Sequence, residues 1–256
     1  GDPTEGALIV VAMKAGFNGA RLHQKVFEER FHYWADKLGY LTWGESASWG
    51  MDHKSEISAR NFLSEWAEVI VRDRNHPSII AWTPFNETRD VGDTRQHHRL
   101  HCDAYELTRA LDPTRPINDA SGYVHVKTDL WTVHTYEQDP VALMEQLMLD
   151  EKGQPMRRFP EWEPPYEGQP YIVDEFGGIK FVPEPEMQYR ENSWGYGEAA
   201  KTQDEFYQRL RDLVNVILRY DHTCGYCYTQ LTDVEQEQNG IYAYDRSTKF
   251  DPGTIR

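Results

Sequence analysis

The sequence predicts an α/β fold, a (β/α)8 TIM barrel, from three observations. Short apolar runs alternate with longer amphipathic stretches along the chain, which is typical of parallel α/β folds. The length of 256 residues is one at which α/β barrels commonly form a single domain. No internal repeat or low-complexity linker interrupts the pattern. We therefore expect residues 1–256 to form a single barrel domain.

The apolar runs and the amphipathic stretches predict the individual elements. Strands are expected at residues 19–22, 41–44, 79–83, 116–118, 130–133, 171–173 and 225–228. Helices are expected at residues 27–38, 58–74, 95–111, 141–149 and 204–220, and several of them end just before a Gly or Pro. The long irregular segment 177–202 follows a strand, so it is a candidate lid over the catalytic face.

The two ends of the chain fit a complete barrel less well. Residues 8–11 favour a strand, but too few residues separate them from Gly19 for a parallel crossover, so we expect a helix over 6–15. Residues 245–256 are short and rich in Pro, Gly and Asp, which argues against a final helix. The expectation is an incomplete barrel that lacks its first strand and last helix, as a fragment of a larger multidomain enzyme would.

Composition excludes several classes of function. The 27 basic and 42 acidic residues give a net charge of −15, which argues against a nucleic-acid partner. No apolar run approaches the ~20 residues that cross a bilayer, so we expect no membrane partner. Three cysteines, an odd number, and the lack of a visible signal peptide favour the cytoplasm, although a removed leader would leave no trace. Oligomeric state is not predicted.

Two predicted strands continue directly into carboxylates. Glu87 follows the strand at 79–83, and Glu175 follows the strand at 171–173. The carboxyl ends of barrel strands converge on one mouth, so the two acids are expected to face one another. Such a pair suits glycoside hydrolysis, in which one carboxyl protonates the leaving oxygen and the other attacks the anomeric carbon. Solvated rim acids would give the same pattern in so acidic a chain.

Several motifs, occurring in order, resemble glycoside hydrolase family 2, the β-galactosidase and β-glucuronidase family. They are NHPSIIAW at 75–82 with Asn86 and Glu87, VDEFG at 173–177, GFNGAR at 16–21, WADKLG at 34–39 and LDPTRP at 111–116. The resemblance implies a TIM-barrel catalytic domain with a retaining mechanism. By this resemblance Glu87 is the acid/base and Glu175 is the nucleophile.

Other strand ends supply candidate substrate-binding residues. Asn86 can bind the sugar 2-hydroxyl, and Arg21 can hold Glu175 ionised, bind a hydroxyl or form a structural ion pair. Many family members read Arg-x-Ser-His here, so His23 stands one place before the usual His, which Gln24 replaces. Glu45 matches an acid that binds a cation in some relatives. A hydrogen bond from Glu45 to substrate or to Arg21 is the stronger expectation, so no metal and no cofactor are predicted.

The later strands add four further candidates. His134 and Tyr136 lie two residues apart on one face of the sixth strand, where a role in the pocket is favoured over core packing. Trp194 and Tyr228 are candidate platforms for stacking on a sugar.

Two polar motifs are expected to lie at the surface and to have no function in the site. His97, His98 and His101 share a predicted helix and could bind zinc at i, i+4 spacing, but a surface helix is the stronger expectation. The acidic run at 233–237 could bind hydroxyls or a cation, and a solvated loop without such a function is the expectation favoured over this alternative.

The sugar is expected to be neutral and β-linked, with galactose favoured. Glucuronidases of the family carry Asn-x-Lys after the last strand, whereas residues 237–240 read EQNG, and an acidic mouth would repel a uronate. The alternative is a carbohydrate-binding barrel without turnover, or an inactive fragment. A metal-dependent hydrolase would need two or more strand-end histidines with a bridging acid, and only His23 and His134 qualify.

Overall fold

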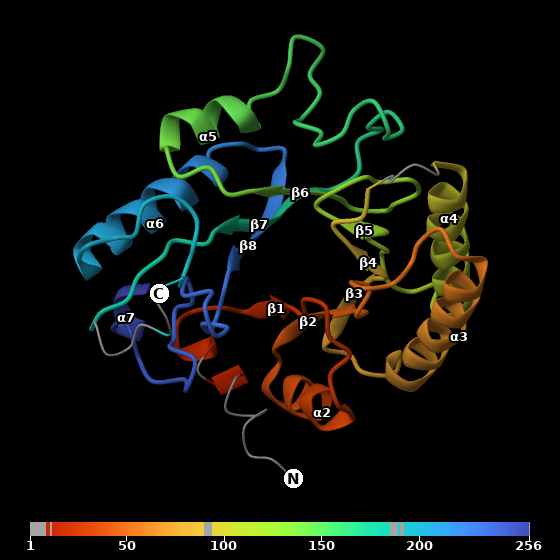
Figure 1. The fold of residues 1–256 in the computed structure, drawn as a ribbon, viewed down its shortest axis with the longest axis horizontal. Helices are drawn as coiled ribbons and strands as arrows, with labels where there is room; N and C mark the ends of the chain where they lie inside the picture. The colour runs from red at the N-terminus through yellow and green to blue at the C-terminus, as the bar shows by residue number, and fades with distance from the viewer. Residues whose placement is uncertain (1–8, 11, 90–93, 185–188, 190–191, 256) are drawn as a thin grey trace. The chain divides into compact units, whose positions relative to one another are not determined.

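The fold is described from a computed structural model that covers residues 9–10, 12–89, 94–184, 189 and 192–255 (Figure 1). The chain divides into two compact units. Unit 1 comprises Gly1–Met13, Asn18–Val133 and Arg157–Ile172, and unit 2 comprises Lys14–Phe17, His134–Met156 and Val173–Arg256. Each unit is described by itself.

Unit 1 is built on a parallel sheet with the order β1-β2-β3. Its strands are β1 (Gly19–Arg21), β2 (Leu41–Glu45) and β3 (Ile79–Thr83). Two short strands, β4 (Phe85–Asn86) and β5 (Ala120–Ser121), form a second parallel pair. A single parallel bridge between Trp82 and Ile117 connects β3 to the segment that leads into β5.

The helices of unit 1 are α2 (Glu29–Leu38), α3 (Glu56–Asp73) and α4 (Thr94–Leu111). Helix α2 ends at Gly39, whose left-handed φ of 68° lets its N–H reach back to the last turn. The side chain of Ser55 caps α3 by accepting from the Ser58 N–H. Helices α3 and α4 lie side by side, and their apolar faces bury Phe85 of β4 (Figure 1).

Unit 2 contains the ends of two strands, a complete third strand and three helices. Strands β6 (Trp131–Thr135) and β7 (Tyr171–Gly177) begin in unit 1 and end in unit 2, and β8 (Thr223–Thr229) completes the order β6-β7-β8. The helices are α5 (Pro140–Leu147), α6 (Gln203–Ile217) and α7 (Pro252–Ile255). Asp139 caps α5, and Phe206 of α6 stacks on Phe250 with a centroid distance of 4.1 Å.

Most predicted elements are confirmed within a few residues. The expected strands at 19–22, 41–44, 79–83, 130–133, 171–173 and 225–228 and all five expected helices have counterparts in the structure. The expected strand at 116–118 is wrong, since this segment contributes only the bridge at Ile117, and β4 and β5 were not predicted. Pro84 separates β3 from β4, and without an N–H it cannot continue the ladder.

The helix expected at 6–15 is confirmed for the part that the structure describes. Residues 9–10 and 12–14 are helical, and residues 6–8 and 11 of the expected helix lie outside the described part. At the other end α7 has four residues, Pro252–Ile255. The described strands form three separate ladders of three, two and three strands.

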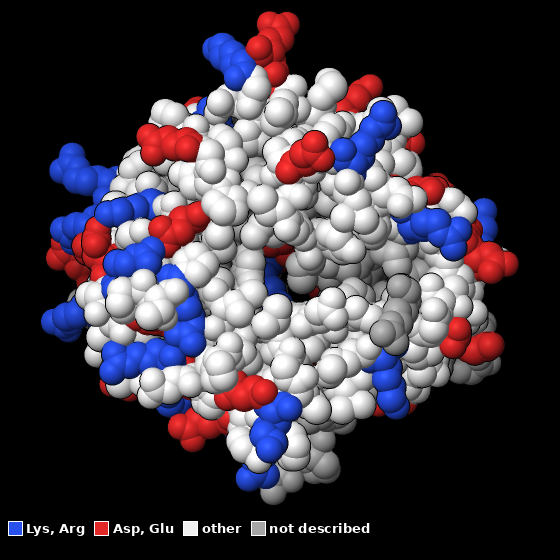
Figure 2. Space-filling view, turned by 180° about the vertical axis from the view of Figure 1, so that it is seen from behind, with Lys and Arg blue, Asp and Glu red and all other residues white. Residues whose placement is uncertain are grey.

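The surface carries charges of both signs. Lys and Arg side chains occur together with Asp and Glu side chains on the face drawn in Figure 2. Among the described helices, none combines the length and the apolar character that crossing a membrane requires.

Candidate active site

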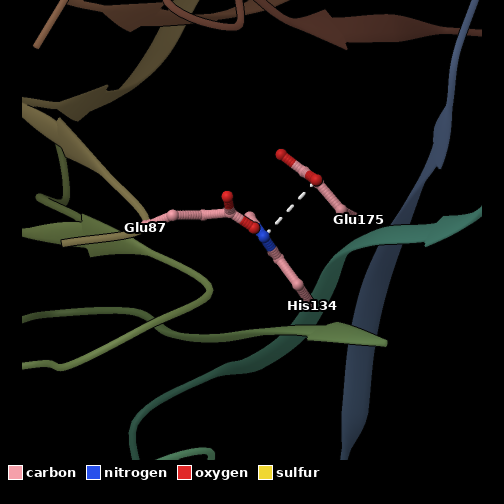
Figure 3. Close-up of side chains that lie close together, drawn as sticks. All are labelled: Glu87, His134 and Glu175. Atoms are coloured by element: carbon pink, nitrogen blue, oxygen red, sulfur yellow. Dashed lines mark ion pairs between the residues drawn. The ribbon is translucent and has the colours of Figure 1, made fainter. Parts of the chain in front are cut away.

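Glu175 lies inside β7 in a dense set of polar contacts within unit 2. Its residue exposure is 8%, and the Tyr136 hydroxyl donates a hydrogen bond to Glu175 Oε2. His134 Nδ1 lies 3.4 Å from the same oxygen, and Figure 3 shows the two side chains pointing toward each other. The expectation that His134 and Tyr136 share one face of the sixth strand is met, because both reach Glu175.

Tyr136 is held in place by aromatic stacking. Its ring lies parallel to that of Tyr196, with a centroid distance of 3.5 Å and an interplanar angle of 3°. Gly178 makes room for this stack, because a Cβ there would lie 2.4 Å from Tyr196 Cδ2. Burial, and next the negative charge of Glu175, raise the pKa of Tyr136 far above its usual value. The phenol therefore stays protonated and can donate to an ionised Glu175.

His134 contacts carboxylates with both ring nitrogens. While Nδ1 lies near Glu175, Nε2 lies 3.4 Å from Asp174 Oδ1. Asp174 and Glu175 are neighbours in β7, so their side chains leave opposite faces of the strand. The His134 ring therefore lies near the carboxylates of two consecutive residues of β7.

Glu237 brings a further carboxylate into the electrostatic environment of Glu175. Asn239 Nδ2 donates to Glu237 Oε1 over 3.1 Å, and Gln230 Nε2 donates to Asn239 Oδ1 over 2.8 Å. Burial raises the pKa of Glu237, the hydrogen bond from Asn239 opposes this shift, and the charge of Glu175 adds to it. The expected solvated acidic loop therefore contains a half-buried acid beside the candidate nucleophile.

In unit 1, Glu87 follows β4 directly and has an unusual backbone. Its φ of 50° lies in the left-handed region, which non-glycine residues seldom adopt. The Glu87 N–H donates to Ser121 O over 3.0 Å, so β5 supports the turn. Its side chain is half-buried.

Asn86 is the hub of a buried network in unit 1. Arg21 Nη2 donates to Asn86 Oδ1 over 2.5 Å, and His23 Nε2 lies 3.3 Å from Asn86 Nδ2. Arg21 also forms a bidentate pair with Glu45, with distances of 2.7 and 3.0 Å. The predicted hydrogen bond between Arg21 and Glu45 is confirmed. Both Glu45 oxygens accept from protein groups, and the Gln24 N–H is one of the donors, so this acid is poorly placed to bind a cation.

Gln24 is a structural residue that sequence reasoning did not assign. Its side-chain oxygen accepts from the N–H groups of Ser48 and Trp49, both over 2.9 Å. Trp49 in turn donates from Nε1 to Asn86 O over 3.3 Å. The signal that could have found Gln24 is its position, since it occupies the place of the family histidine.

The two candidate stacking residues differ in exposure. Trp194 is 39% exposed, so part of its side chain is accessible to a ligand. Its backbone forms a parallel bridge with Glu237. Tyr228 is 8% exposed and its hydroxyl donates to Asn239 O over 3.1 Å. Its ring packs edge-on against Phe176. The structure therefore places Tyr228 in the core, where it braces the segment that carries Glu237 and Asn239.

The histidines of α4 and the acidic run at 233–237 were both expected to be solvent-exposed, and both expectations are wrong. His97 and His101 are buried, with exposures of 3% and 0%, because α4 turns this side toward β4. In the acidic run, Asp233 is buried and forms an ion pair with Lys249, whose Nζ lies 2.9 Å from Asp233 Oδ1. Polar side chains at these positions lie inside the protein, which hydropathy alone does not show.

Comparisons with known proteins indicate the family of the chain. The family model described as "Glycosyl hydrolases family 2, TIM barrel domain" matches residues 14–212. The β-galactosidase of Vibrio vulnificus (strain YJ016) is 26% identical over 121 residues, which are 44% of this chain and 11% of that protein. The β-glucuronidase of Sus scrofa is 25% identical over 190 residues, which are 69% of this chain and 28% of that protein.

The fold also matches a solved structure. The β-D-glucuronidase structure from Dictyoglomus thermophilum superposes with a TM-score of 0.75 at 20% identity, covering 99% of this chain and 46% of that one. This chain thus spans less than half the length of the relatives it matches. The matched motifs and the matched fold show that the chain belongs to glycosyl hydrolase family 2 and carries its TIM-barrel domain.

Proposed function

We propose that the protein is a retaining β-glycosidase that removes a terminal neutral β-linked sugar, with Glu175 as the nucleophile and Glu87 as the acid/base. One observation carries the proposal: Tyr136 and His134 converge on a single oxygen of Glu175. Donors arranged in this way favour an ionised carboxylate and fix its direction, and a carboxylate nucleophile needs both.

The proposed reaction has two displacements. In the first, the Glu87 carboxylic acid gives its proton to the glycosidic oxygen while a Glu175 oxygen attacks the anomeric carbon, so the aglycone leaves as an alcohol. In the second, Glu87 takes a proton from water, and the hydroxide displaces Glu175 from the sugar. A retaining mechanism places such carboxyl groups ~5–5.5 Å apart.

Asn86 is proposed to bind the sugar 2-hydroxyl. Its Oδ1 accepts from Arg21, which fixes the direction of the amide group. The Nδ2 group carries two hydrogens, one of which can point at His23 while the other points at substrate. A hydrogen bond to the 2-hydroxyl strengthens as the oxocarbenium-like state develops.

Glu237 supports the choice of a neutral sugar. The matched relatives include proteins named β-galactosidase and β-glucuronidase, so family membership leaves the sugar open. Burial, and to a smaller extent the charge of Glu175, raise the pKa of Glu237, and a substrate carboxylate would add a third acidic group to this pair. Sugar hydroxyls can instead donate to Glu237, and a β-galactoside is the favoured substrate.

The proposal is tested by hydrolysis of a panel of nitrophenyl β-glycosides. Glu175→Gln should lower kcat by at least ~10³-fold, because no covalent intermediate can form. Glu87→Gln should spare the first step for substrates with good leaving groups, which need little protonation. Glu205→Gln changes a glutamate in α6 and is the matched control, with activity close to the parent protein.

Equal activity in all these proteins would refute the enzyme proposal. Thermal stabilisation by galactose or another sugar without product formation would instead support the non-catalytic binding barrel. Faster hydrolysis of the glucuronide than of the galactoside would overturn the sugar assignment and leave the mechanism intact.

A further inference from the structure

A series of contacts between buried polar side chains begins at Thr88, the residue next to Glu87. The Thr88 hydroxyl lies 2.9 Å from His101 Nε2, and His101 Nδ1 lies 3.7 Å from Asp119 Oδ2. His101 and Asp119 are fully buried, and Thr88 is nearly so. The three residues come from the turn after β4, from α4 and from the residue before β5, and all belong to unit 1.

Asp119 is the last residue in this series of contacts, and its side chain is an ionised carboxylate. Its Oδ1 lies 2.7 Å from His125 Nδ1, and its oxygens accept from the N–H groups of Ala120, Val126 and Lys127. Burial alone would raise the pKa of Asp119, but its contacts with His101 and His125 outweigh burial and hold the pKa well below the usual range.

The His101 ring makes its hydrogen bond through one nitrogen. The Thr88 hydroxyl lies at hydrogen-bond distance from Nε2, whereas the 3.7 Å between Nδ1 and Asp119 Oδ2 is too long for a hydrogen bond and leaves an electrostatic contact. Burial lowers the pKa of His101 and so favours a neutral ring. The hydrogen bond between Thr88 and His101 holds the Thr88 side chain. The His101 ring is itself held against Phe85, with a centroid distance of 4.5 Å.

The backbone of Glu87 needs such support. A left-handed conformation is unfavourable for a non-glycine residue, and it persists only where neighbouring contacts enforce it. Glu87 N donates to Ser121 O over 3.0 Å, and Val124 N donates to Thr88 O over 3.2 Å. These hydrogen bonds fix the backbone at residues 87–88. The polar contacts that link Thr88, His101 and Asp119 fix the Thr88 side chain.

We propose that Thr88, His101 and Asp119 are positioning residues that hold Glu87 in its left-handed conformation and so aim its carboxyl group at the leaving oxygen. The aim at the leaving oxygen rests on the proposed role of Glu87 as the acid/base. The three residues touch no reacting atom in this account and act through the backbone of Glu87.

The test compares Thr88→Val with Thr108→Val. Thr88→Val removes the hydroxyl that forms a hydrogen bond with His101 and keeps the branched shape of the side chain. Thr108 is also buried in unit 1, where its hydroxyl accepts from Trp66 Nε1 over 2.8 Å and donates to Ala104 O over 2.7 Å. Both variants lose a buried hydroxyl and leave a ring nitrogen without its partner, but only Thr88 adjoins Glu87.

The first readout is structural and requires no activity. Crystal structures of the two variants should show Glu87 leaving the left-handed region, or occupying two conformations, in Thr88→Val and keeping its φ near 50° in Thr108→Val. His101→Phe, which retains the stack on Phe85, should behave like Thr88→Val. An unchanged Glu87 conformation in both Thr88→Val and His101→Phe would overturn the positioning role.

The second readout is the dependence of kcat/KM on the leaving group, measured with aryl β-galactosides. General acid catalysis contributes ~10²–10⁴-fold, so partial misalignment should lower kcat/KM about 10-fold or more for phenyl galactoside and less than ~3-fold for the dinitrophenyl compound. An equal loss for both substrates in Thr88→Val, with a leaving-group effect in Glu87→Gln, would refute the inference and leave the function standing. A lack of any leaving-group effect in Glu87→Gln would refute the proposed function, and the crystal structures would still decide the positioning role.

Discussion

The two candidate catalytic carboxylates are supported in different ways. Glu175 lies within a regular strand and is held by side chains, with Tyr136 and His134 meeting one of its oxygens. Glu87 follows a two-residue strand in a left-handed conformation, and its backbone N–H and the neighbouring Thr88 both form hydrogen bonds within unit 1. The difference matches the proposed roles, since a nucleophile must stay charged whereas an acid/base must change its protonation state at a fixed place.

Each unit also contains a buried ion pair near its candidate residue. In unit 1 Arg21 pairs with Glu45 and reaches Asn86, and in unit 2 Lys249 pairs with Asp233 in the loop that precedes Glu237. These pairs give a direct way to disturb one neighbourhood and leave the other intact.

The largest expected effect on stability is from Arg21→Met. It leaves the Glu45 carboxylate buried without its cation, which should lower the free energy of unfolding by about 3–5 kcal/mol. Lys249→Met should cost a similar amount by isolating Asp233. Denaturant titration measures both. A loss below ~1 kcal/mol in either variant would show that the remaining carboxyl group is neutral or hydrated.

Tyr136→Phe should affect the Glu175 neighbourhood alone. Loss of a hydrogen bond to a charged group costs about 1.5–3 kcal/mol, so kcat should fall roughly 10- to 100-fold for every leaving group. The matched control is Tyr220→Phe, which removes a hydroxyl that donates to Met144 O over 2.7 Å elsewhere in unit 2. A loss confined to poor leaving groups would contradict the separation of roles, because that pattern belongs to Glu87.

His97 and His53 of unit 1 should lower the stability as the pH is lowered. Burial, and next the neighbouring His101, lower the pKa of His97 to about 2, and burial lowers the pKa of His53 to about 4. The folded state therefore binds fewer protons than the unfolded state below pH ~6.5, so stability present above that pH is lost as the pH falls. We expect His97 to contribute a loss on the order of 1–2 kcal/mol between pH 7.5 and 5.

His97→Phe checks this assignment. Thermal unfolding at several pH values should show a weaker acid dependence in the variant than in the parent protein. The same acid dependence in both proteins would assign the effect to other groups.

The sequence predicts the surroundings of Glu175 better than those of Glu87. An apolar run leading into Asp174 and Glu175, and His134 and Tyr136 two places apart, follow from strand periodicity. The left-handed turn at Glu87 does not, because β4 exists only through its pairing with β5, far along the chain. Burial of His101 and Asp119 is equally hidden, since polar residues become buried only where tertiary partners satisfy them.

Trapping the covalent intermediate tests the central claim most directly. A 2-deoxy-2-fluoro β-galactoside with a dinitrophenyl leaving group should glycosylate the nucleophile quickly, while the fluorine slows its hydrolysis by destabilising the oxocarbenium-like transition state. Peptide mass spectrometry should then find one sugar attached to Glu175, and none in Glu175→Gln. Attachment to a different carboxylate, or galactoside turnover without any trapped intermediate, would contradict the account.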